Sequence, residues 1–405
     1  MKTINEKLNL LKQKIDKNEK ITIAIFGLGS VGCYLLDYLV SLADPQLRLV
    51  VVGRNAEKMQ QDVNIIRTAA TIRRQMRSEI IIEGGCDFKN ISSIETVLRR
   101  VQPDFIVNSS RLYAGLKYGT ISWSNLRAYG IWTPLSVLLG KNIMEAYEKV
   151  GCNAISINTS YSDAVIPWLK SAGMAYFDFG SGNLNHLIPR MKFYIAEKYG
   201  IANLNDIDIT LVASHFHDVV ISKEGHTEGI KLLLSIKYHG QELDVNHENV
   251  YKACGIPMPT DQKRNMMNAS SNFDIICSIL TAIRTRTVIK IHTPGVDGNI
   301  GGYPFIIDAT GAEIKGYLTP QYDMNDMHQV NRNSIYCDGI EDVTGGYLIY
   351  TDELIQKVKN RFNVDIPKKI ALSEAEDVAR LLINRIIEPN HIGLQYELGG
   401  SPNSN

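Results

Sequence analysis

The sequence lacks the features that define several large classes of protein. Its six cysteines never form a CxxC or CxxH spacing, so the usual zinc-binding motifs are missing, and several of them stand in apolar stretches. Such cysteines favour a reduced compartment over a disulfide framework. No stretch approaches the roughly 18 consecutive apolar residues of a membrane span. Lysine plus arginine and aspartate plus glutamate both number 43, which argues against nucleic acid or an anionic membrane as the main partner.

What the chain does contain is typical of a soluble globular protein. Its 405 residues, 44% hydrophobic and 21% charged, are enough for two or three packed units. In residues 1–20, charged side chains alternate with Ile4, Leu8, Leu11 and Ile15 at helical spacing, and the apolar segment of a signal peptide is missing. We therefore expect an N-terminal helix that packs on the body of the protein, and a cytoplasmic location.

From residue 21 the sequence alternates short β-branched runs with stretches of helical spacing. The runs expected to form strands are 21–26, 47–53, 79–85 and 103–110. This alternation predicts an α/β fold, with a doubly wound parallel sheet and helices on both faces. We assign residues 21–165 to this domain. We assign residues 166–405, where the regular alternation ends, to an α+β domain for substrate binding and oligomerisation.

A glycine-rich turn follows the first expected strand and opens the first helix of the sheet domain. It consists of Gly27, Leu28, Gly29, Ser30, Val31 and Gly32. In a GxGxxG turn the first glycine permits a tight turn, the second lets the backbone approach a pyrophosphate, and the third lets helix and strand pack closely. The helix N-terminus adds amide donors and a positive dipole end. The strand before the motif and the helix after it favour a Rossmann dinucleotide-binding domain over a simple glycine turn.

The end of the second expected strand bears on the choice of cofactor. NAD-binding domains usually have an aspartate or glutamate there, which binds the ribose hydroxyls. This chain has Gly53, Arg54 and Asn55 instead, with Lys58 close behind. Because an arginine pairs with a 2′-phosphate, the segment favours NADP. NAD remains the alternative if Arg54 is only a solvated residue at a strand end.

The segments after the later strands are expected to complete the site. The residues expected near the nicotinamide end the fourth and fifth strands and are Asn108, Ser109 and Asn158. Residues 111–135 are rich in aromatic side chains and are predicted to be irregular, as is typical of a loop that closes over a substrate. Arg111 and Arg127 in this loop are candidates for substrate binding. The alternative for both is an ordinary surface charge.

From about residue 140 the order of features resembles the lactate/malate dehydrogenase superfamily. The segment 138–165 is similar to that family's helix and strand before an Asn-Pro-x-Asp segment, with Asn158 and Asp163 in place of its Asn and Asp. FGSGNLNHLIPRMKFYIAEKYGI (179–201) is similar to its Gly-x-Gly-x-x-Leu-Asp-x-x-Arg helix. ITLVASHFHD (209–218) stands where the family has a strand and a Gly-Glu-His-Gly-Asp turn.

The resemblance implies an NAD(P)-dependent dehydrogenase in which a histidine is the acid/base, an aspartate orients it and an arginine binds a carboxylate. Dimers or tetramers are usual for the family, so we expect a homodimer or homotetramer. The catalytic positions depart from the family's pattern. Asn185 stands at the aspartate position, and Arg190 lies two residues beyond the arginine position. Phe216 stands at the histidine position, between His215 and His217.

The two histidines that flank this position are therefore the candidates for the acid/base, with Asn185 as the orienting partner. If the strand before them continues, His215 and His217 point to the same face. His186 and Arg190 are candidates for substrate binding, and a hydrogen-bonded structural role is the alternative for each histidine. The spacing fixes no third metal ligand, so we assign no metal site.

Together these features predict an NADP-dependent oxidoreductase that transfers a hydride between the nicotinamide and a polar small molecule. The reacting group would be a carbonyl/alcohol or an imine/amine pair. One alternative is an NAD-dependent, metal-assisted glycosidase or lyase, because residues 182–186 are similar to the GLNH run of family four glycoside hydrolases. The cysteine those enzymes use is absent here. The other alternative is a protein that binds NAD(P) without catalysis.

Overall fold

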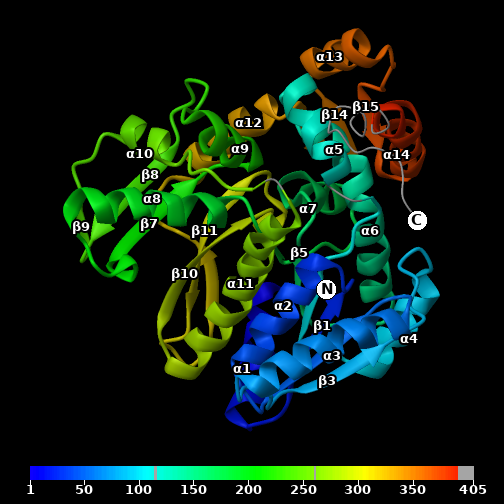
Figure 1. Ribbon diagram of the computed structural model, residues 1–405, viewed down its shortest axis with the longest axis vertical. Coiled ribbons are helices and arrows are strands. Elements are labelled where there is room, and N and C mark those ends of the chain that lie inside the picture. The colour runs from blue at the N-terminus through cyan, green and yellow to red at the C-terminus, as the bar shows by residue number, and fades with distance from the viewer. Residues whose placement is uncertain (114–115, 260, 391–405) are drawn as a thin grey trace, which may run out of the picture.

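The computed structural model describes residues 1–113, 116–259 and 261–390, and a six-stranded sheet organises it (Figure 1). Its strands are β1 (Ile21–Phe26), β2 (Leu47–Val52), β3 (Glu79–Glu83), β4 (Phe105–Asn108), β5 (Ile155–Asn158) and β6 (Phe179–Gly180). They pair in parallel in the order β3-β2-β1-β4-β5-β6, which confirms the predicted doubly wound sheet. Because the chain crosses from β3 to the far side of β1, a crevice opens beyond the carboxyl ends of β1 and β4, where such sheets bind ligands.

Helices cover both faces of this sheet. They include α1 (Ile4–Asp16), α2 (Ser30–Ser41), α3 (Ala56–Ile72), α4 (Ile91–Val101), α6 (Thr133–Lys149) and α7 (Ser162–Ser171). Strand β1 shows why two layers of cover are needed, since all six of its residues are buried. Ile23 and Ile25 belong to one hydrophobic core, whereas Ala24 and Phe26 belong to the other. Successive side chains of a strand point to opposite faces, so a strand this apolar requires a helical layer on each.

The N-terminal helix forms where the sequence predicts it. A capping box between Thr3 and Glu6 satisfies the amides at its start. Leu8 and Leu11 are buried in the core shared with the sheet, so the helix packs on the body of the protein. Across the described residues, none of the helices combines the length and the apolar character that crossing a membrane requires.

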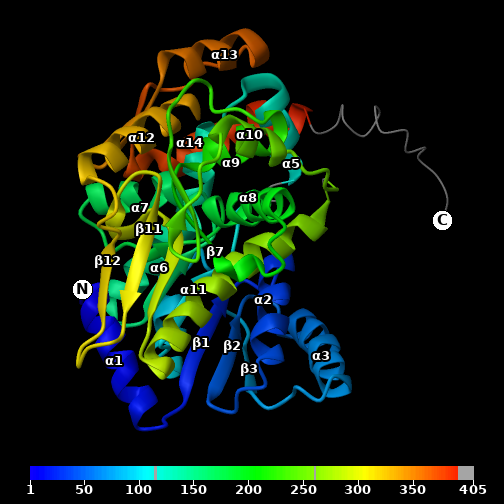
Figure 2. The same cartoon turned by 90° about the vertical axis from the view of Figure 1, so that its left-hand side faces the viewer.

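Residues 184–337 form two small antiparallel sheets with helices around them, and a third antiparallel sheet lies in the C-terminal segment (Figure 2). The strands are β7 (Ile207–Val212), β8 (Leu233–Tyr238), β9 (Gln241–Glu242), β10 (Val288–Pro294), β11 (Gly302–Asp308) and β12 (Lys315–Leu318). The helices are α8 (Leu184–Tyr199), η3 (Leu204–Asp206), α9 (His215–Glu224), α10 (His247–Ala253), η4 (Gln262–Arg264), α11 (Asn265–Thr285), η5 (Val296–Gly298) and α12 (Met324–Cys337). The long helix α11 packs on α2 and so joins this unit to the six-stranded parallel sheet.

The C-terminal segment returns to the other face of the parallel sheet. Its elements are β13 (Ile340–Thr344), β14 (Tyr347–Tyr350), α13 (Asp352–Phe362), β15 (Lys369–Ala371), η6 (Leu372–Glu374), α14 (Ala375–Leu382) and η7 (Ile383–Ile387). Figure 1 shows it in orange and red, beside α6, and the hydroxyl of Tyr350 donates to the carbonyl of Ile131 at 2.8 Å. The sheet also extends past the boundary expected near residue 165, because Phe179–Gly180 pairs with β5.

Two local expectations from the sequence are wrong. The aromatic segment 111–135 is largely helical where it is described, with α5 (Leu116–Ile121), η1 (Ser122–Leu126), η2 (Gly130–Trp132) and the start of α6. The strand β7 ends at Val212 and does not continue through the histidines, because α9 begins at His215. Residues two apart on a helix point to nearly opposite sides, so His215 and His217 do not share a face.

Candidate active site

The glycine turn has the geometry that a dinucleotide requires. Gly27 has a φ of +97°, and a Cβ atom on Gly32 would lie 2.2 Å from the carbonyl oxygen of Gly27, so neither position accepts a larger residue. A Cβ atom on Gly29 would meet nothing within 4 Å, because this residue faces open space. The backbone of Gly29 is therefore free for a close approach by a phosphate, and the turn fits the expected cofactor.

The turn opens onto a cleft of about 660 Å³. Its lining comes from the glycine turn, the ends of β2 and β4, the start of α3, η4 and the first residues of α11: Gly27, Leu28, Gly29, Ser30, Val31, Gly53, Arg54, Asn55, Lys58, Ser109, Ser110, Arg111, Gln262, Asn265 and Asn268 among others. No side chain caps the N-terminus of α2, so its first amides face the cleft with a positive dipole end. Asn265 donates to Ser30 Oγ at 2.5 Å and thereby ties α11 to the turn.

The end of the cleft at β2 carries the residues expected to select the cofactor. Arg54, Asn55 and Lys58 all line it, and Arg54 is exposed. The side chain of Asn55 accepts from the amide of Lys58 at 2.9 Å and so caps α3. Two acidic residues, Asp62 and Asp87, line the same end. The geometry therefore offers cations for a phosphate and carboxylates that could accept from a hydroxyl.

The polar residues at the ends of β4 and β5 divide into two groups. Ser109 lines the cleft, and its hydroxyl donates to the carbonyl of Gly27 at 2.7 Å. Asn108 and Asn158 were expected beside the nicotinamide, but both are buried, and Asn108 donates to Asn158 at 2.9 Å. Asn158 also donates to the carbonyl of Ser160 at 2.9 Å. These two side chains shape the turns beneath the cleft and are not part of its lining.

A histidine–carboxylate pair joins the first turns of α8 and α9. The Nδ1 atom of His186 lies 3.2 Å from Asp218 Oδ2, and both side chains are largely buried, with 12% and 14% of their surface exposed. Because a carboxylate only accepts, Nδ1 carries the proton of the neutral ring and Nε2 is left as the basic nitrogen. Burial raises the pKa of Asp218, but His186, through its charge and hydrogen bond, together with the charges of His215 and Arg190 outweighs this effect, so that pKa is lowered overall.

The free nitrogen of this pair lies near Asn268, which lines the cleft, although His186 itself is not part of the lining. His186 Nε2 is buried and has no hydrogen-bond partner among the described residues. A Cβ atom on Gly182 would lie 3.5 Å from Asn268 Oδ1 and 3.9 Å from His186 Nε2, so glycine keeps this space open. Asn268 itself lines the cleft. An unpartnered basic nitrogen beside the cleft is what a general acid/base requires.

Arg190 lies one helical turn after His186 on the same face of α8. It is 3% exposed, its Nη1 donates to the carbonyl of Cys254 at 3.0 Å, and its Nε has no partner among the described residues. No carboxylate of the described chain pairs with it within 4.0 Å, and burial lowers its pKa. A buried guanidinium without an anion is costly, which points to an anionic ligand group at this position.

His215 also has a carboxylate partner, on a different element. Its Nδ1 lies 2.9 Å from Oδ2 of Asp338, which is fully buried, and the hydroxyl of Tyr161 donates to the same oxygen at 2.6 Å. Burial lowers the pKa of His215, but Asp338, Asp163 and Asp218 outweigh it, so the pKa is raised above its usual value. The side chain is 20% exposed and does not line the cleft.

His217 does not fit the role of acid/base that the sequence suggested. Its side chain is fully buried, its Nδ1 is hydrogen-bonded to Ser334 Oγ at 2.5 Å, and its Nε2 lies 3.1 Å from the carbonyl oxygen of Thr227. Burial lowers its pKa to about 4. With both nitrogens engaged inside the core, His217 is a structural residue. The cause is the helix at this position, which turns His217 away from the side on which Asp218 meets His186.

Asn185 does not orient a histidine either. Its amide donates to Asp274 Oδ2 on α11 at 3.3 Å. The neighbouring residue, His186, makes the contact that was expected of Asn185, and its partner is Asp218. Compared with the pattern that the sequence resembles, histidine and carboxylate have exchanged helices. Because of this exchange, Asn185 and Phe216, which stand at the family's aspartate and histidine positions, form no histidine–carboxylate pair.

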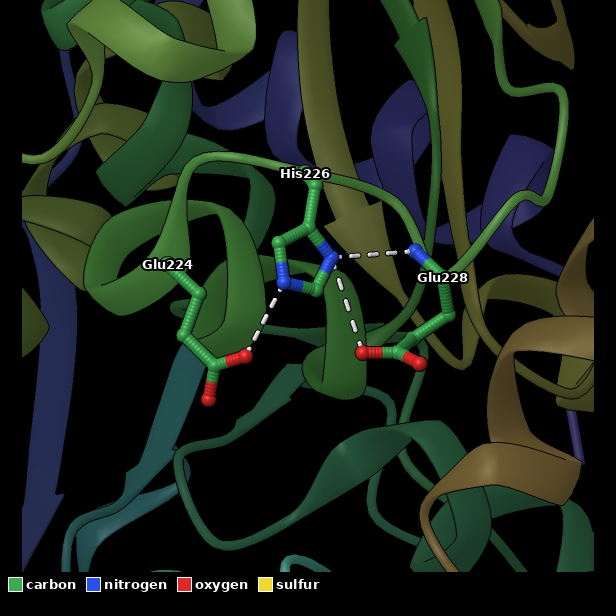
Figure 3. A group of neighbouring side chains, drawn as sticks. All are labelled: Glu224, His226 and Glu228. Carbon is green, nitrogen blue, oxygen red and sulfur yellow. Dashed lines mark hydrogen bonds and ion pairs between the residues drawn. The ribbon is translucent and has the colours of Figure 1, made fainter.

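The cations of the aromatic segment have different surroundings. Arg111 is exposed and lines the cleft, whereas Arg127 does not. Arg127 forms ion pairs with Glu224 and Glu228, and the same two carboxylates flank His226 at 3.0 and 3.5 Å (Figure 3). Among the described residues this is the one group with the number and spacing of ligands for a metal ion. The guanidinium of Arg127 pairs with both carboxylates and offsets one of their two negative charges, so the group has a cationic partner without a metal ion.

Comparison with solved structures identifies the fold. The malate dehydrogenase of Cryptosporidium parvum matches with a TM-score of 0.51 at 11% identity, over 78% of this chain and 96% of that one. The malate dehydrogenase of Picrophilus torridus, in its apo form, gives 0.51 and 11%, over 79% and 96%. That of Plasmodium falciparum gives 0.50 and 12%, over 78% and 95%. The predicted lactate/malate dehydrogenase-like fold is thereby confirmed.

The comparisons of sequence found no match, in contrast to the comparison of structures. No protein-family model matches the chain, and none of the curated proteins matches it. At these levels of identity the structural likeness defines the fold alone. The site residues therefore have to be argued from their own geometry.

Proposed function

We propose that this protein is an NADP-dependent oxidoreductase in which His186, oriented by Asp218, is the acid/base. The observation that carries the proposal is the unpartnered Nε2 of His186 beside a cleft that begins at a GxGxxG turn. The solved structures compared above are malate dehydrogenases, which supports a dehydrogenase. The homodimer or homotetramer expected from the sequence remains part of the proposal, and light scattering would test it.

The chain's own residues account for binding and positioning. The glycine turn and the N-terminus of α2 hold the diphosphate, and Arg54 with Lys58 holds the 2′-phosphate. When bound, the nicotinamide accepts or supplies the hydride. Asn265 and Asn268 on α11 line the other side of the cleft and limit the access of water to the reacting atoms.

The proton follows a separate route. In the oxidising direction His186 Nε2 takes the proton of the substrate's hydroxyl or amine, and in the reducing direction it returns that proton. Asp218 holds the ring with its proton on Nδ1 and stabilises the imidazolium that forms. The reacting carbon of the substrate would then lie between His186 and the nicotinamide. Arg190, one turn further along the same face of α8, holds an anionic group of that substrate, such as a carboxylate.

A metal-assisted glycosidase or lyase has less support. The one group of described residues suited to a metal, around Glu224 and Glu228, is already occupied by Arg127 and is exposed. His186 is engaged by Asp218 rather than by a second histidine or a cysteine. A catalytically inactive binding protein has no need for the buried, unpartnered Nε2 of His186 or Nε of Arg190.

The experiment that tests the proposal measures binding and turnover separately. The binding of NADPH is followed by its fluorescence, and turnover is screened with 2-oxo acids, with and without ammonia or amino acids. We expect NADPH to bind, one class of substrate to be reduced, and His186→Gln to lower kcat by about 10²–10⁴-fold while its Kd for NADPH stays within about twofold. His226→Gln, at the exposed group of Figure 3, is the matched control and should behave as the parent.

Two results would overturn this assignment. One is NADPH binding without turnover over the whole panel, which would indicate a binding protein. The other is a His186→Gln variant with unchanged kcat, which would show that another group moves the proton.

A further inference from the structure

Asp163 connects the two helices that carry the proposed acid/base pair. It lies in the first turn of α7 and its side chain is fully buried. Its Oδ1 accepts from the backbone amide of His215 at 3.0 Å, and its Oδ2 accepts from the side-chain amide of Asn183. Each oxygen of one carboxylate therefore holds a different segment of the chain.

Each of the two donors stands at the start of a helix, three residues before one member of the acid/base pair. Asn183 is the N-cap residue of α8 and stands three residues before His186. His215 is the first residue of α9 and stands three residues before Asp218. His215 and Asp218 are three residues apart on α9 and lie on the same face, whereas Asn183 directly precedes the turn of α8 that carries His186. Fixing both donors to one carboxylate fixes the starts of both helices, and with them the distance between His186 and Asp218.

The backbone on one side of this connection is strained. Asn183 has a φ of +52° with a ψ of −99°, outside the regions that L-residues favour, and Gly182 before it has a φ of +101°. Such a conformation persists only where the surrounding structure enforces it. The hydrogen bond from Asn183 to a buried carboxylate is such a constraint, and it acts on the turn that leads directly into His186.

We propose that Asp163 is a positioning residue, which holds the first turns of α8 and α9 in register so that Asp218 orients His186. This inference rests on the proposed role of His186 as acid/base. Asp163 does not line the cleft, so its effect passes through the two helices and not through contact with the substrate or cofactor. The structure thus assigns a function to the aspartate at the end of the TSYSD segment that is separate from proton transfer.

Asn183→Gly is the sharpest test. It removes the amide that binds Asp163, yet glycine adopts a positive φ without strain, so the fold is retained. We expect kcat to fall by about 10- to 100-fold through misplacement of His186, with the Kd for NADPH within about twofold of the parent. Asn363→Gly is the matched control, because Asn363 also has a positive φ of 53° and caps α13 far from the cleft. Asp163→Ala, which removes both acceptors, should lose at least as much kcat as Asn183→Gly.

A double-mutant cycle with Asp218→Asn separates positioning from a general structural role. If Asn183 and Asp163 act through the pair, Asn183→Gly should change kcat by less than about twofold once Asp218→Asn is present. Parent-like turnover of Asn183→Gly, or an undiminished further loss in the Asp218→Asn background, would overturn the inference. If either result is found while His186→Gln is inactive, only the role of Asp163 is refuted and the proposed function stands. If His186→Gln is active, the proposed function fails, and the inference about Asp163 fails with it.

Discussion

His186 donates from Nδ1 to Asp218 Oδ2 at 3.2 Å, and this contact links the first turns of two helices that the sequence places 32 residues apart. Asp218 also lies in the field of Arg190 and His215, which help to keep its pKa below the usual value. The carboxylate is therefore ionised near neutral pH. An ionised Asp218 both sets the tautomer of His186 and stabilises the charge that the ring gains when it accepts a proton.

Asp218→Asn should separate these two effects of the carboxylate from simple packing, because the substituted side chain has the same size. Its amide can donate to Nδ1 and so favour the wrong tautomer, with the proton on Nε2. We expect kcat to fall by about 10²–10³-fold and the Kd for NADPH to stay within about twofold. Stopped-flow measurement of hydride transfer is the appropriate check. A variant with parent-like rates would show that His186 needs no carboxylate.

The parallel sheet and the glycine turn could be predicted from the sequence because both depend on local patterns. The buried strand β1, the turn after Phe26 and the start of α2 at Ser30 all lie within one short segment. The helices of the aromatic segment were harder to predict, because they depend on contacts with the C-terminal segment, such as that between Tyr350 and Ile131.

The acid/base pair could not be predicted because its members are distant in sequence and exchanged relative to the pattern that the chain resembles. A signal for α9 was nevertheless present. Ser214 stands before the histidines as an N-cap residue, and Asp218 falls in the first turn, where a helix favours a negative charge. Reading that segment as the start of a helix would have placed His215 and Asp218 on one face and removed His217 from consideration.

Arg54→Ala tests the preference for NADP. A charge-assisted hydrogen bond contributes about 1.5–3 kcal/mol, so we expect the Kd for NADPH to rise by about 10- to 100-fold and the Kd for NADH to change little. Arg67→Ala, on the exposed side of α3 and outside the cleft, should leave both values unchanged. Titration of each cofactor by fluorescence provides the comparison. An equal change for NADPH and NADH would contradict recognition of the 2′-phosphate by Arg54, and Asp62 would become the residue to test for NAD.

Lys7→Met tests the attachment of the N-terminal helix. The Nζ of Lys7 is buried and lies 2.8 Å from both carboxylate oxygens of Asp178, which also accepts from the amide of Ser156. Loss of the ammonium leaves a buried carboxylate without its counter-charge, which costs about 3–5 kcal/mol. We expect a clear fall in the free energy of unfolding, measured by urea titration. Lys12→Met, which breaks a more exposed pair with Asp16, should leave the free energy of unfolding nearly unchanged.

His292→Gln tests the pH dependence of stability. His292 is buried, and its Nε2 accepts from the amide of Leu211 at 3.2 Å. Burial, with the charges of Lys290 and Lys192, lowers its pKa from 6.5 to about 3. Between these two values the unfolded chain binds a proton that the folded protein does not. The stability contributed by neutral His292 is therefore complete above pH 6.5 and is lost as the pH falls towards 3.

A glutamine at this position accepts the same hydrogen bond from Leu211 but does not titrate. Each pH unit in this window changes the free energy of unfolding by up to about 1.4 kcal/mol per histidine. Between pH 6.5 and 4.5 we therefore expect the parent protein to lose about 2 kcal/mol more than His292→Gln does. The buried His217 titrates in the same way in both proteins, so its contribution cancels in the comparison. Parallel curves for the two proteins would show that the folded protein takes up a proton at His292 as readily as the unfolded chain does.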